Sequence, residues 1–148
     1  MNLNLKDFTA RKKTPPPPQS FTALIVDDEE PVRKFVDRVL REGGYKTAVA
    51  GDGPEALEVA TANGSFDILV TDLLMPKMNG DELARRMRQR EPSLKVLYLT
   101  GFSDRLFKEK STLWADEAFL EKPCSVKGLL EAVSLLLTGS VDTPHQPA

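Results

Sequence analysis

The sequence predicts an α/β protein in which helices cover both faces of a parallel five-stranded sheet. Short apolar runs rich in β-branched residues alternate with longer segments whose apolar residues recur at helical spacing. Gly, Pro, Asn and acidic residues separate the two kinds of segment. Such alternation is typical of parallel strands joined by right-handed crossovers, and the length of 148 residues favours one domain.

Five segments are predicted to be strands. The central one is Ile68-Leu69-Val70, which continues to Asp72 and is typical of a strand buried on both faces of a parallel sheet. The other four are apolar runs that each end at a polar or turn-forming residue. They are Phe21–Val26, Tyr45–Ala50, Val96–Leu99 and Ala118–Leu120.

Five helices are predicted to alternate with these strands. The first has Pro31 in its opening turn, where proline is well tolerated, and Gly43-Gly44 ends it. The other four helices are predicted from apolar residues at helical spacing or from a capping residue. The second runs from Gly53-Pro54 to Asn63-Gly64, the third from about Asn79 to Arg90, the fourth is capped by Ser103, and the last runs from Val126 to Leu137.

Periodicity alone does not fix the strand order. One compatible order, 2-1-3-4-5, places the ends of the first and third strands side by side, where ligands bind in open α/β sheets. The first strand ends at Asp27 and Asp28, and the third ends at Asp72. Three carboxylates would then repel one another, which requires a proton or a cation among them. Oxygen ligands without His or Cys suit Mg²⁺.

Two further strand ends supply a hydroxyl group and a cation. Thr100 ends the fourth strand and Lys122 follows the fifth. A carboxylate nucleophile, a metal, a hydroxyl donor and a fixed cation are the groups that phosphoryl transfer needs. Each has a simpler interpretation by itself: an acid pair as a helix cap, a threonine as a turn residue, a lysine as solvated surface. The hypothesis therefore depends on the whole ordered set.

The segments LIVDDEEPVRKFV, LVTDLLMPKMNGDELA, VLYLTGFS and FLEKP together resemble the CheY-like receiver domain of two-component response regulators. The resemblance covers about Thr22 to Thr138. It implies a doubly wound (βα)5 flavodoxin-like fold with strand order 2-1-3-4-5. It also implies that Asp72 accepts a phosphoryl group from a histidine kinase or a histidine phosphotransfer protein.

The resemblance further implies a metal site. Asp28 and Asp72 would ligate Mg²⁺ directly, Asp27 would do so mostly through water, and the backbone carbonyl group of Leu74 would add a ligand. The domain would be a phosphoacceptor with weak self-phosphorylation and autodephosphorylation activity, and not an enzyme in the usual sense.

The remaining implied roles concern switching. Thr100 and Lys122 would bind the phosphoryl oxygens, and the peptide bond before Pro123 would be cis. Phe119 would change rotamer as Thr100 moves. This would couple the site to the surface formed by the fourth helix, the fifth strand and the last helix, where a target protein or a second copy of the chain would dock.

Four other interpretations share features with this sequence. A haloacid dehalogenase-like phosphatase needs a second Asp two residues after the first, where Leu74 stands. A flavodoxin-like binder would place a phosphate beside four acids, Asp27 to Glu30, which would repel it. A pseudo-receiver that binds partners without phosphotransfer, and a receiver domain excised from a hybrid histidine kinase, are the other two.

Composition bears on the partners, the disulfide content and the cellular location of the protein. The net charge of −2 and the absence of a basic block give no case for nucleic acid, and one cysteine excludes an internal disulfide. No signal peptide or membrane-spanning run is found, so a cytoplasmic location is expected.

The chain is predicted to have three parts. Residues 1–20, with Pro15–Pro18, are predicted to be flexible, residues 21–138 are predicted to form the receiver domain, and residues 139–148 are predicted to form a disordered tail. With so few residues after Thr138, output is expected through protein contacts, or the chain would act as a phosphate relay or sink.

Overall fold

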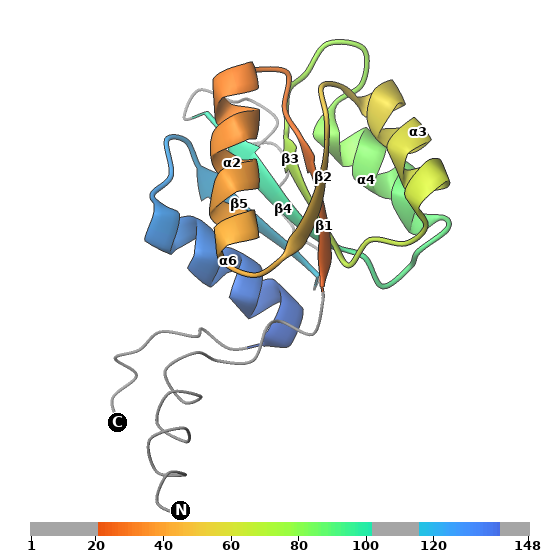
Figure 1. The fold of residues 1–148 in the computed structure, drawn as a ribbon. Coiled ribbons are helices and arrows are strands. Elements are labelled where there is room, and N and C mark those ends of the chain that lie inside the picture. The colour runs from red at the N-terminus through yellow and green to blue at the C-terminus, as the bar shows by residue number, and fades with distance from the viewer. Residues whose placement is uncertain (1–20, 102–115, 140–148) are drawn as a thin grey trace, which may run out of the picture.

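The computed structural model describes residues 21–101 and 116–139, in which a central sheet lies between two layers of helices (Figure 1). The strands and helices keep the alternating order predicted from the sequence. The strands are β1 (Thr22–Val26), β2 (Lys46–Ala50), β3 (Ile68–Asp72), β4 (Lys95–Thr100) and β5 (Glu117–Glu121). The helices are α2 (Glu30–Glu42), α3 (Gly53–Asn63), α4 (Gly80–Arg88) and α6 (Val126–Thr138).

The five strands are parallel and lie in the order β2-β1-β3-β4-β5, which confirms the predicted doubly wound fold. Because β1 pairs directly with β3, with Val26 opposite Thr71, the residues that end these two strands lie at the same level. Asp27 follows β1 and Asp72 ends β3. The strand order thus brings together two carboxylates that are 45 positions apart in the sequence.

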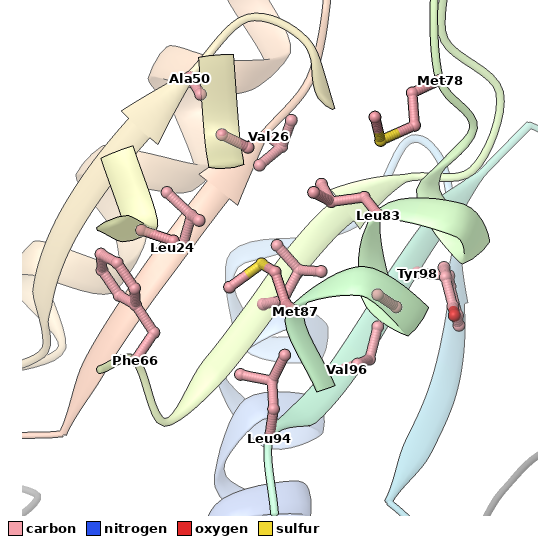
Figure 2. Close-up of a cluster of buried hydrophobic side chains, with 14 of the residues drawn as sticks. Leu24, Val26, Ala50, Phe66, Met78, Leu83, Met87, Leu94, Val96 and Tyr98 are labelled. Carbon is pink, nitrogen blue, oxygen red and sulfur yellow. The ribbon is translucent and has the colours of Figure 1, made fainter. Parts of the chain in front are cut away.

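Alternate side chains of each strand point to opposite faces of the sheet and form two apolar cores. Leu24 and Val26 point to the layer of α3 and α4, where Figure 2 shows them with Met87 and Tyr98. Ala23 and Ile25 point to the layer of α2 and α6. Strand β3 is buried along its whole length because helices cover both of its faces, as its continuous apolar run predicts.

Local sequence signals set the helix ends. Pro31 lies in the first turn of α2, and Gly43 forms its C-cap. The Asp52 side chain caps α3 by accepting a hydrogen bond from the backbone N–H of Glu55 at 2.8 Å. Ser125 caps α6 in the same way.

The observed boundaries differ from the predicted ones by one or two residues. Strand β5 extends on both sides of the predicted segment, and helix α4 ends two residues earlier than expected. The predicted fourth helix, with Ser103, lies outside the described residues. Within the described ranges, we find no helix with the length and apolar character needed to cross a membrane.

Candidate functional site

Three carboxylates converge at the carboxyl ends of β1 and β3. One oxygen atom from each of Asp27, Asp28 and Asp72 lies within 4.8 Å of the others. Asp27 is fully buried, Asp72 is 8 % exposed, and Asp28 is exposed to solvent. The cluster therefore has a closed side at Asp27 and an open side at Asp28, from which a ligand can enter.

The buried carboxylate of Asp27 is held by its neighbours. Its Oδ1 atom accepts a hydrogen bond from the backbone N–H of Glu29 at 2.9 Å. Its backbone carbonyl accepts one from Nη1 of Arg33 at 2.7 Å, and its backbone N–H donates to the carbonyl of Ala50 at 3.3 Å. Glu29 and Arg33 are part of the site although they are not among the residues predicted for it. The available signal was the position of Arg33 one turn into α2, on the helix that the acids precede.

Lys122 reaches the carboxylates from the end of β5. Its Nζ atom lies 3.0 Å from Oδ2 of Asp27, 3.4 Å from Oδ2 of Asp72 and 3.7 Å from Oε1 of Glu29. The backbone N–H of Lys122 donates to the carbonyl of Thr100 at 2.8 Å, and the Lys122–Pro123 peptide bond is cis. The lysine is thus fixed inside the cluster, and its side chain is only 17 % exposed.

The cluster contains more negatively charged groups than positively charged ones. Burial, together with the charge of Asp27, raises the pKa of Asp72 to about 7 in spite of Lys122. Burial also raises the pKa of Asp27. For Lys122 burial acts to lower the pKa, but its contacts with Asp27 and Asp72 outweigh burial and raise it. One ammonium group does not balance three carboxylates, so the site favours either a proton on Asp72 or a further cation.

The loop after β3 closes tightly on the carbonyl group of Asp72. The backbone N–H of Gly80 donates to the carbonyl of Leu73 at 2.8 Å. A Cβ atom on Gly80 would lie 2.2 Å from the backbone oxygen of Asp72, so only glycine fits there. Leu74, at the start of this loop, is 45 % exposed.

The predicted switch residues lie on β4 and β5. Thr100 is buried at the end of β4, and its hydroxyl group donates to the carbonyl of Gly101 at 3.0 Å. Phe119 is half-buried on β5, in register with Tyr98, and their ring centroids are 5.2 Å apart. The two predicted switch residues therefore occupy adjacent strands, as expected from the sequence.

The cluster has the chemistry of a Mg²⁺ site. Its donors are carboxylate oxygens, without nitrogen or sulfur ligands, which is the set that Mg²⁺ prefers. Oδ2 of Asp27 is buried and lies 3.0 Å from the ammonium group of Lys122. Among the described residues, this oxygen accepts no hydrogen bond of good geometry. The three carboxylates therefore fit a divalent cation.

The chain, with this fold and this acidic cluster, matches a known family of signal-transduction domains. The family model described as "Response regulator receiver domain" matches residues 23–134. The chain therefore belongs to the response regulator receiver domain family. Receiver domains act in phosphorelay signalling as phosphoacceptors that bind Mg²⁺ at an acidic cluster and interact with histidine kinases or phosphotransfer proteins.

Two curated relatives and one solved structure illustrate the match. The chain is 37 % identical over 119 residues to the sensor kinase CckA of Brucella abortus, covering 80 % of this chain but 13 % of that protein. It is 32 % identical to the response regulator receiver protein CpdR of the same organism, covering 77 % of this chain and 94 % of CpdR. The Vibrio cholerae chemotaxis protein CheY4 superimposes with a TM-score of 0.70 and 29 % identity, covering 79 % of this chain and 98 % of that one.

Proposed function

We propose that Asp72 accepts a phosphoryl group from the phosphohistidine of a histidine kinase or a phosphotransfer protein in a Mg²⁺-dependent reaction. The observation that carries the proposal is the position of Asp72 between an ammonium group and two further carboxylates. Oδ2 of Asp72 lies 3.4 Å from Nζ of Lys122, and the carboxylates of Asp27 and Asp28 lie within 4.8 Å. The proposal assigns residues 21–138 to the receiver domain.

In the proposed reaction a carboxylate oxygen of Asp72 forms a bond to phosphorus while the bond from phosphorus to the histidine nitrogen breaks. The nitrogen keeps the electron pair of that bond. Asp72 must be ionised to attack, and its pKa of about 7 leaves it only partly ionised at neutral pH until a cation enters. Lys122 would stabilise the charge on a phosphoryl oxygen, because its ammonium group already lies beside Asp72.

Asp28, Asp72 and the backbone carbonyl of Leu74 would hold Mg²⁺, with Asp27 contributing mostly through water. The contacts of Asp27 support this division, because its oxygens already face Lys122 and the N–H of Glu29. When bound, Mg²⁺ would neutralise charge on the transferring phosphoryl group.

Output would follow from a change in Thr100. Its hydroxyl group donates to Gly101 in the present state and would turn to donate to a phosphoryl oxygen. That movement would open space for Phe119, which lies on the neighbouring strand. The surface affected would be formed by residues 103–115, β5 and α6, where a protein partner or a second copy of the chain would dock. Of this surface, residues 103–115 lie outside the described ranges.

Acetyl phosphate with Mg²⁺, read by intact mass, tests the acceptor. The wild-type chain should gain one phosphoryl group, Asp72→Asn should gain none, and Glu58→Gln, an exposed carboxylate on α3, should behave as wild type. Equal labelling of Asp72→Asn would disprove the assignment of Asp72. No labelling of the wild-type chain would favour a pseudo-receiver.

A further inference from the structure

The turn between β2 and α3, formed by Gly51, Asp52 and Gly53, contacts both loops that carry the carboxylates, although it contributes no carboxylate to the cluster. We infer that this β2–α3 turn positions the cation site, and that Asp52 and Lys77 are its positioning residues. The inference rests on the proposed Mg²⁺ site. It assigns the pair a role in cation affinity beyond a contribution to stability.

The first contact is with the loop after β1. The carbonyl of Ala50, directly before the turn, accepts a hydrogen bond from the backbone N–H of Asp27 at 3.3 Å. A Cβ atom on Gly51 would lie 3.5 Å from Nη1 of Arg33, which in turn donates to the carbonyl of Asp27. The turn thus lies against the groups that hold Asp27 in place.

The second contact is with the loop after β3, and it has two parts. Oδ1 of Asp52 is occupied by the α3 cap, while Oδ2 lies 3.2 Å from Nζ of Lys77. A Cβ atom on Gly53 would lie 2.7 Å from Sδ of Met78, so the methionine packs directly on the glycine backbone. An ion pair and a packed side chain therefore fix the tip of this loop on the N-terminus of α3.

The backbone of this loop needs such support. Lys77 has a φ angle of 72°, in the left-handed region that non-glycine residues seldom adopt. At the base of the loop, the N–H of Gly80 bonds to the carbonyl of Leu73. Leu74, whose carbonyl is the proposed metal ligand, lies between Leu73 at the base of the loop and Lys77 at its tip. A displaced tip would therefore displace the ligand.

The direction in which a substitution changes the Mg²⁺ affinity distinguishes a positioning role from a simple charge effect. Lys77→Met removes a positive charge near the site, so a charge effect alone would tighten Mg²⁺ binding. Loss of positioning would weaken it. Asp52→Asn removes the partner charge but keeps the α3 cap, because asparagine is an equally good N-cap residue.

The experiment is a titration with MgCl₂ followed by amide chemical shifts, which report folding and affinity together. Lys77→Met, Asp52→Asn and the double variant should each weaken binding by about two- to five-fold, as an exposed pair allows. The double variant should be no weaker than the singles, because all three remove the same contact. Lys77→Arg should restore affinity. Lys34→Met, which breaks an exposed ion pair with Glu30 on α2, is the matched control and should not weaken binding.

Several results would overturn the inference. Tighter binding in Lys77→Met, or opposite effects of the two single variants that cancel in the double variant, would leave only a long-range charge effect. Unchanged binding in Lys77→Met would show that the ion pair with Asp52 has no role in cation affinity. If the wild-type chain binds Mg²⁺ and Asp72→Asn does not, any of these results for Lys77→Met or the double variant disproves the positioning role and leaves the proposed metal site standing. If the wild-type chain shows no Mg²⁺-dependent shifts, the proposed metal site is wrong and the inference fails with it.

Discussion

Replacing Asp72 by asparagine should stabilise the metal-free fold at neutral pH, although the same change abolishes the proposed phosphorylation. The pKa of Asp72 is raised from its ordinary value of 3.8 to about 7 by burial and by the charge of Asp27. The folded chain therefore binds this proton more tightly than the unfolded chain. The contribution of Asp72 to the free energy of unfolding should fall as the pH rises from about 4 to 7, and the loss should be complete above pH 7.

The size of the effect follows from that difference in pKa. At about 1.4 kcal/mol per pH unit, the difference corresponds to at most about 4 kcal/mol of destabilisation by the ionised carboxylate at pH 8. Asparagine has nearly the same shape and cannot ionise. We expect Asp72→Asn to be more stable than wild type by about 2–4 kcal/mol at pH 8 and nearly equal to it at pH 4.

Urea unfolding in the presence of EDTA, followed by circular dichroism at several pH values, measures this difference. Glu58→Gln removes an exposed carboxylate from α3 and should show no comparable gain at pH 8. A stability difference for Asp72→Asn that does not change between pH 4 and pH 8 would refute the electrostatic reasoning. So would a variant that is less stable than wild type at pH 8.

Three further predictions concern the metal, the loop after β3 and a buried ion pair. Mg²⁺ should raise the melting temperature of the wild-type chain more at pH 8 than at pH 5, since its ligands must be deprotonated; an equal rise at both pH values would count against carboxylate ligands. Gly80→Ala should destabilise the fold by about 2–4 kcal/mol in urea unfolding, because its Cβ atom would collide with the backbone oxygen of Asp72; a neutral result would mean that the loop can move away. Arg88→Met should cost about 3–5 kcal/mol, because it removes the guanidinium 2.7 Å from the buried carboxylate of Glu117, whereas Arg86→Met, at an exposed pair, should cost less than about 1 kcal/mol. Similar costs for the two arginine variants would contradict this account of burial.

The order and type of the described elements could be predicted because each strand has its own local signal. The continuous apolar run of β3 predicts a strand with both faces buried, and this is confirmed. The strand order could not be derived from periodicity, because each strand's pattern reports burial and not its neighbours. The family resemblance supplied the order, and the pairing of β1 with β3 confirms it.

Contacts between distant residues account for what sequence analysis missed. The apolar run that predicts the fifth strand begins at Ala118 and leaves out Glu117. Glu117 is nevertheless buried in β5, because Arg88 of α4 pairs with it and Tyr98 of β4 donates a hydrogen bond to it. Likewise the predicted start of the third helix near Asn79 gives no reason for glycine at position 80, because the need for glycine comes from the approach of the Asp72 carbonyl.

The central proposal is that Asp72 is the phosphoacceptor, and chemical trapping tests it most directly. Borohydride reduces an aspartyl phosphate to homoserine, which tandem mass spectrometry can locate in the chain. After treatment with acetyl phosphate and Mg²⁺ and then borohydride, we predict homoserine at position 72 and at no other aspartate. Homoserine at another position, or none in a chain that carries a phosphoryl group by intact mass, would contradict the assignment.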